Sequence, residues 1–166
     1  PDYLDDPVLV DYLQAIWKPL LAAGQTRGDV PDELRERLAW ELLINRVKEV
    51  NAFALPGGYM GVNLGLIAVT DSPEELASVL AHEMSHVSQR HISRMITRQQ
   101  RDAPWLMGAM ILGALAARNN ADVANAAIAG SQALAVQNQL NFSRDMEREA
   151  DRIGYGLMVP AGFASQ

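Results

Sequence analysis

The chain contains no cysteine in its 166 residues. A disulfide scaffold, a cysteine-ligated metal cage and a cysteine nucleophile are therefore all excluded. Basic residues are also scarce, because 14 lysines and arginines stand against 20 aspartates and glutamates, a formal net charge of −6. Phosphate binding needs a basic surface, so this balance argues against a nucleic-acid partner. With 49% hydrophobic and 20% charged residues, the composition is that of an ordinary globular protein.

The start of the sequence, "PDYLDD", has neither the basic n-region nor the apolar h-region of a secretory signal. The chain stops at "AGFASQ", which does not have the character of a natural end. We therefore expect residues 1–166 to be a single domain taken from a longer protein.

Apolar residues follow two different patterns before and after about residue 71. Residues 5–23 have helical spacing, with Gly24 as the predicted end, and a polar linker or short helix follows. Three strands are predicted, the last two joined by a glycine-rich hairpin, at 38–46, 51–57 and 59–69. Later helices are predicted at 71–100, 104–117, 122–142 and 143–159. Strands followed by helices predict an α+β fold in which a small sheet precedes a helical bundle.

Two of the three histidines lie in the segment "AHEMSH", residues 81–86, inside the helix that Ser72 and Pro73 are predicted to begin. Residues i and i+4 share one face of a helix, so His82 and His86 can reach the same cation. Glu83 is turned about 100° from His82, where it can reach a metal-bound water. This HExxH pattern predicts a catalytic metal helix. Zinc is favoured because it accepts histidine and carboxylate ligands and leaves one position open.

The third ligand is not expected to be His91. It lies about 180° around a continuous helix from His82, which favours a structural role for it. A carboxylate must then come from elsewhere, and the helix predicted at 143–159 offers Glu147 and Asp151, four residues apart. We expect both to face inward beside two small residues that permit close helix packing, Ala150 and Gly154. The opposite, solvated flank is predicted to carry Asp145, Glu149 and Arg152. Geometry leaves open which inward acid binds metal and which orients a ligand histidine.

Three segments carry a resemblance to a known family: "NAFALPGGYMGVNLGLI", "LASVLAHEMSHVSQRHISR" and "NFSRDMEREADRIG". In this order, over roughly residues 45–165, they resemble the zinc metallopeptidases of the CAAX prenyl protease type, the HtpX- and BepA-like gluzincins. The resemblance implies a zincin-like metallopeptidase domain with one Zn²⁺ per chain. It also implies His82, His86 and Glu147 as metal ligands, Glu83 as general base on a zinc-bound water, and Asp151 as the partner of a ligand histidine.

The same resemblance implies a periplasmic metalloendopeptidase that hydrolyses misfolded or envelope proteins. Polypeptide substrates, a C-terminal tetratricopeptide-repeat domain and the outer-membrane assembly machinery would be its partners. An alternative function is a zinc-stabilised, chaperone-like binding module for outer-membrane protein quality control, with little or no turnover.

Three further features of the sequence indicate possible contact surfaces. The strand at "YMGVNLG" is interpreted as an edge that pairs with an extended substrate peptide. The apolar segment 104–117 is too short to span a bilayer and indicates a buried helix. Alternatives are a lid over the cleft or contact with a membrane surface through residues 104–136. A basic stripe precedes them, which is typical of a solvated helix face or of an anionic-lipid contact, at Arg90, Arg94, Arg98 and Arg101.

Overall fold

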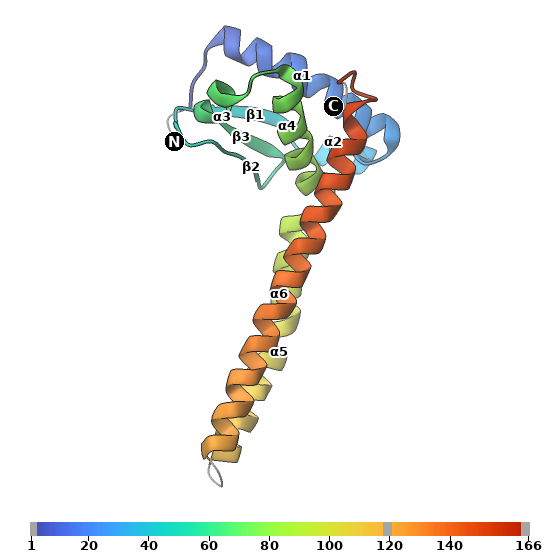
Figure 1. Ribbon diagram of the computed structural model, residues 1–166. Coiled ribbons are helices and arrows are strands. Elements are labelled where there is room, and N and C mark those ends of the chain that lie inside the picture. Colours follow the sequence, from blue (N-terminus) through green and yellow to red (C-terminus); the bar gives the residue numbers. More distant parts are fainter. Residues whose placement is uncertain (1–2, 118–120, 164–166) are drawn as a thin grey trace. The chain divides into compact units, whose positions relative to one another are not determined.

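The computed structural model describes residues 3–117 and 121–163 (Figure 1). The chain divides into two compact units, the first formed by Pro1–Arg90 with Arg148–Gln166 and the second by His91–Glu147. The elements in chain order are α1 (Pro7–Arg27), α2 (Asp32–Arg37), β1 (Glu41–Asn45), β2 (Ala52–Leu55), β3 (Tyr59–Asn63), α3 (Leu64–Val69), α4 (Pro73–Ser88), α5 (His91–Ala117) and α6 (Ala121–Met158). A small sheet therefore precedes a helical region, as the order of patterns in the sequence predicted.

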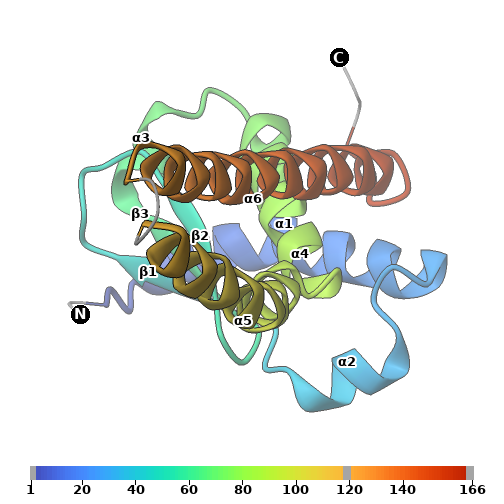
Figure 2. The same cartoon turned by 90° about the horizontal axis from the view of Figure 1, so that it is seen from below.

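Strand β3 is the central strand of the sheet, whose order is β1–β3–β2. It runs parallel to β1, with Glu41 beside Tyr59, and antiparallel to β2, with Ala52 beside Val62. The predicted hairpin between the second and third strands is therefore confirmed. The interpretation of β3 as an open edge is wrong, because strands pair with both of its sides. The outer strand that contacts α4 is β2 (Figures 1 and 2).

The third strand is shorter than the predicted 59–69, because the chain turns into α3 after Asn63. Gly65 allows this turn, since the carbonyl of Lys48 lies where a side chain at Gly65 would project. An apolar run alone does not distinguish a strand from a short buried helix. The apolar run over 59–69 thus forms a strand, β3, followed directly by a short helix, α3.

Helix α1 continues past Gly24 and ends at Gly28, which has a left-handed φ of 83°. Gly24 is buried within the helix, and an added Cβ would lie 3.0 Å from Cγ2 of Val30. The glycine predicted as a helix end is instead a point of close packing. At the other end, the carboxylate of Asp6 accepts hydrogen bonds from the amides of Val8 and Leu9.

Helix α4 begins as predicted. The hydroxyl of Ser72 accepts a hydrogen bond from the amide of Glu75 at 3.2 Å, Pro73 is the first helical residue, and the Glu75 carboxylate accepts from the amide of Asp71 at 2.8 Å. The predicted extension to about residue 100 is wrong, because α4 ends at Ser88 and a new helix starts at His91. Arg90 between them has a left-handed φ of 54°, which a continuous helix cannot contain.

Helix α6 replaces the two helices predicted at 122–142 and 143–159. Ser143, predicted as an N-cap, lies in its interior. No proline interrupts this stretch, and a serine inside a long helix costs only a few tenths of a kcal/mol, about 0.5 at most. A capping residue is therefore a weak boundary signal without a neighbouring helix breaker.

The core of the first unit forms where α1, α4 and the C-terminal part of α6 supply their apolar faces. Its largest fully buried side chains include Leu13, Trp17, Leu20, Leu76, Leu80, Met84 and Leu157. Trp17 donates its indole hydrogen to the carbonyl of Trp40 at 2.8 Å, and Trp40 donates to the carbonyl of Leu34 at 3.0 Å. These bonds tie α1 to the segment that leads into β1.

The second unit contains α5 and the first part of α6, which run side by side in Figure 1. The guanidinium of Arg98 lies 4.5 Å from the centre of the Phe142 ring, within the range of a cation–π contact. Among the described residues, no helix is both long and apolar enough to cross a membrane.

Gly154 of α6 lies directly against the backbone of α4. An added Cβ would be 2.9 Å from the amide nitrogen of His82 and 3.0 Å from the carbonyl carbon of Ala81. The neighbouring Ala150 is fully buried. The expectation that these two small residues permit close helix packing is confirmed.

We predict that Gly154→Ala lowers the stability of the protein by about 1–3 kcal/mol, because the α4 backbone must move to admit the methyl group. The measurement is thermal unfolding followed by circular dichroism. Gly130→Ala is the matched control in the same helix, where an added Cβ meets nothing within 4 Å and alanine is the better helix former. Equal melting temperatures for the two variants would contradict the packing described for Gly154.

Candidate metal centre

His82 and His86 lie one helical turn apart on α4, and both are half-buried. Their Nε2 atoms are 3.0 Å apart, with ring centroids at 4.8 Å and an interplanar angle of 64°. The two imidazoles thus direct the same ring nitrogen toward a common point.

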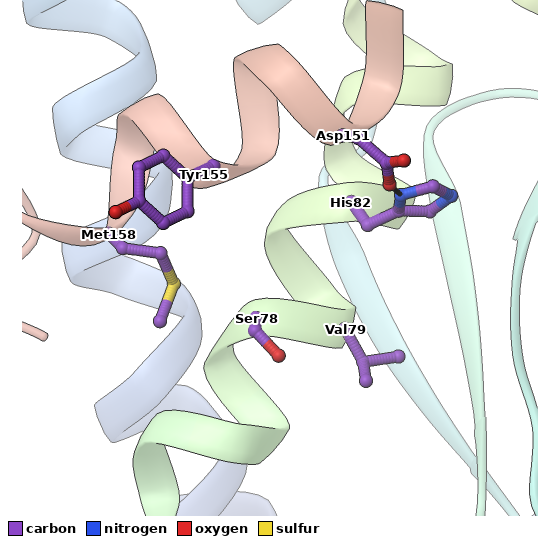
Figure 3. A pocket seen from close by; sticks show the side chains of 6 residues that line it. All are labelled: Ser78, Val79, His82, Asp151, Tyr155 and Met158. Carbon is purple, nitrogen blue, oxygen red and sulfur yellow. Dashed lines mark hydrogen bonds and ion pairs between the residues drawn. The ribbon is translucent and has the colours of Figure 1, made fainter. Parts of the chain in front are cut away.

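Asp151 of α6 sets the orientation of His82 (Figure 3). Its carboxylate lies 2.8 Å from Nδ1 of His82. A carboxylate can only accept, so Nδ1 donates the hydrogen, and in the neutral form of the ring Nε2 then keeps a lone pair. This is the tautomer that a histidine needs to bind a metal through Nε2.

Glu147 completes a group of three residues that could hold a metal ion. The ligand atoms of His82, His86 and Glu147 all lie within 4.8 Å of one another. Glu147 precedes Asp151 by one turn of α6, so the two carboxylates share one side of the helix. The structure therefore brings together the three residues that the sequence resemblance named as ligands.

The spacing of the two histidines fits a zinc ion. Two nitrogens that bind one tetrahedral zinc, each about 2.0–2.1 Å from it, lie about 3.3 Å apart. The observed Nε2 separation of 3.0 Å is close to that value. The donor set of two imidazoles and one carboxylate is also that of catalytic zinc sites with an open fourth position.

The predicted inward orientation of the two acids needs a correction. Glu147 is exposed, and the side chain of Asp151 is 72% exposed, whereas Glu149 on the supposedly solvated flank is half-buried. Asp145 and Arg152 are exposed, as predicted. Asp151 contacts His82 of α4 and still remains exposed, so contact between the two helices does not by itself bury an acid.

The helix break after α4 changes the expected position of His91 relative to His82. The 180° angle to His82 assumed a continuous helix, and α4 ends before His91. His91 is nevertheless only 2% exposed, and it is not part of the group formed by His82, His86 and Glu147. Glu83, the predicted general base, is half-buried on α4 next to His82.

A pocket of about 480 Å³ lies beside His82, within the first unit (Figure 3). Its lining consists of Ser78, Val79, His82, Asp151, Tyr155 and Met158. Ser78, Val79, Tyr155 and Met158 were not predicted from the sequence as residues of the site. Their spacing was the available signal, because Ser78 precedes His82 by one turn and Tyr155 follows Asp151 by one turn.

Comparison with known proteins agrees with this site. The model of peptidase family M48 matches residues 13–166. The beta-barrel assembly-enhancing proteases of Yersinia pestis and Escherichia coli (strain K12) are 35% and 31% identical to the chain over 161 and 163 residues. The mitochondrial metalloendopeptidase OMA1 of Arabidopsis thaliana is 35% identical over 128 residues, which cover 77% of this chain and 24% of that protein.

The class that the site and the family match define is that of a metallopeptidase. The chain belongs to peptidase family M48, and the predicted family is confirmed. The alignments to the two bacterial relatives cover 97% and 98% of this chain but only 31% and 32% of those proteins. The chain thus spans about a third of the length of these curated relatives.

We predict that Asp151→Asn weakens the binding of Zn²⁺ about 10–100-fold, because asparagine keeps an acceptor oxygen but removes the charge that supports His82. Competition with a chromophoric chelator measures the affinity. Asp145→Asn on the same helix is the matched control and should bind Zn²⁺ as the wild type does. Equal affinities of the two variants would show that Asp151 does not support a metal ligand.

Proposed function

We propose that the chain is the catalytic domain of a zinc-dependent metalloendopeptidase with a zincin-like site. The observation that carries the proposal is the convergence of His82, His86 and Glu147 while Asp151 holds Nδ1 of His82. In this proposal His82, His86 and Glu147 bind one zinc ion per chain, and Asp151 orients His82. Residues 1–166 act as one catalytic domain of a longer protein with a C-terminal repeat domain.

A zinc ion in this position would polarise a peptide carbonyl and make water a nucleophile near neutral pH. Glu83 lies on α4 directly after His82 and is half-buried. Its carboxylate accepts the proton of the water as the oxygen attacks the carbonyl carbon. Glu83 then donates that proton to the nitrogen of the leaving amine, so the peptide bond breaks without a free amide anion.

The substrate in this proposal is an extended polypeptide. Strand β2 is an outer strand of the sheet and contacts α4, so its edge can pair with a peptide beside the metal site. Val79 and Met158 give the pocket next to His82 an apolar lining that suits an apolar side chain. The printed names of the bacterial relatives connect them with β-barrel assembly. By that likeness we propose misfolded outer-membrane proteins in the periplasm as substrates.

We predict that Glu83→Gln lowers the rate of peptide cleavage by about 10²–10⁴-fold without loss of zinc, because glutamine cannot accept the proton of the water. The measurements are cleavage of an unfolded protein and the zinc content of the same sample. Glu74→Gln, also on α4, is the matched control and should leave both unchanged.

The Glu83→Gln variant also tests the alternative function. Cleavage at the wild-type rate would remove Glu83 from the mechanism. Restoration of cellular function by a cleavage-deficient Glu83→Gln protein would favour the zinc-stabilised binding module over the peptidase.

A further inference from the structure

The second unit exposes a patch of large apolar side chains that the proposed peptidase site does not use. On α5 they lie within residues 105–115 and are 45–68% exposed. The members of this patch, called the α5 apolar face from here on, are Trp105, Met107, Met110, Ile111, Leu112 and Leu115. At 100° per residue they cover about 220° of the helix circumference. An apolar surface this broad is unusual for a helix that faces water.

The opposite, less exposed side of the same helix carries small residues beside Leu106, and Ile128 of α6 is also half-buried. Ala109 is half-buried and Gly113 is buried on α5, and Ser131 is only 9% exposed on α6. In a helical bundle that folds in water, large apolar side chains face inward. Here most of the large apolar side chains of 105–115 face outward instead, as they do on helices that contact lipid.

The charges of α5 are confined to the segment that precedes this face. No charged residue occurs over 103–117 or 123–143. Arg94, Arg98 and Arg101 project within about 40° of Trp105 around the helix axis, at one edge of the apolar face, and the first two also lie over the ring of Phe142 on α6. Asp102 is the one carboxylate of α5, and it lies 3.6 Å from both Arg98 and Arg101. The segment therefore keeps a net positive charge.

We propose that the α5 apolar face docks into the surface of a membrane that contains anionic lipid. Arg94, Arg98 and Arg101 contact the headgroup phosphates, and Trp105 lies at the boundary with the acyl chains. The charge-free segment 103–117 is about 22 Å long, shorter than the ~30 Å hydrocarbon core, so the helix lies in the interface and does not span it. The positive charge next to the apolar face favours an anionic lipid surface over an uncharged protein partner.

The chain carries its own reporter for this docking. Of its three tryptophans, Trp17 and Trp40 are 2% and 7% exposed, whereas Trp105 is 64% exposed. A vesicle-induced blue shift of tryptophan fluorescence therefore reports mainly on Trp105. We expect this shift, and quenching by brominated acyl chains, when the 166-residue chain is titrated with vesicles of phosphatidylcholine and phosphatidylglycerol at 3:1. Vesicles of phosphatidylcholine alone should bind much more weakly.

Two pairs of substitutions separate the apolar and the electrostatic contributions. Ile111→Glu with Leu112→Glu should abolish binding, whereas Val69→Glu, at an apolar residue of the first unit that is 55% exposed, should not change it. Arg98→Gln with Arg101→Gln should weaken binding to the anionic vesicles about fivefold per arginine removed. Circular dichroism verifies that each variant is folded.

Three results would overturn the proposal. The first is no binding to any vesicle. The second is binding that salt reverses without a shift in fluorescence, which would assign it to the arginines alone. The third is a doubling of mass by light scattering that Ile111→Glu with Leu112→Glu abolishes, because a second copy would then cover the face. Glu83→Gln should bind vesicles as the wild type does, so this test is independent of the peptidase proposal.

Discussion

The close approach of α6 to the backbone of α4 at Gly154 determines where the metal-site side chains lie. Because no side chain separates the helices there, Asp151, one turn earlier on α6, comes within 2.8 Å of Nδ1 of His82. That contact fixes the tautomer in which Nε2 of His82 can face Nε2 of His86. Packing between two helices thus arranges the histidines before any metal contributes, which is how a preorganised site reduces the cost of binding its ion.

The sequence predicted those parts of the site that depend on local geometry. The spacing of His82 and His86, the cap at Ser72 and the small residue at Gly154 each have a direct physical meaning along one helix, and each agrees with the structure. Other features depend on contacts distant in sequence. The position of β3 between two strands follows from pairing, and the exposure of Asp151 follows from where α6 meets α4. The helix break at Arg90 had no signal, because a non-glycine residue adopts the left-handed conformation there.

The two units differ in the apolar residues that they expose. In the first unit large side chains such as Trp17 and Leu80 are inside, as expected for a domain whose core is sequestered from water. In the second unit Met146, Gly113 and Ser131 are buried, while the large apolar side chains of Trp105 and Leu112 are exposed. The chain therefore combines a unit with a conventional core, which carries His82, His86 and Asp151, with a unit that has the exposed apolar face we propose to contact lipid.

Zinc stoichiometry tests the central claim most directly, with the wild-type chain compared with Glu147→Gln after dialysis against a weak chelator. The account predicts one zinc per wild-type chain and an affinity more than about 100-fold lower for Glu147→Gln, since a lost ligand should cost more than a lost partner of a ligand. Glu149→Gln, two residues further along the same helix, should retain its zinc. Full zinc occupancy in the Glu147→Gln protein would contradict the account and move the third ligand to another residue.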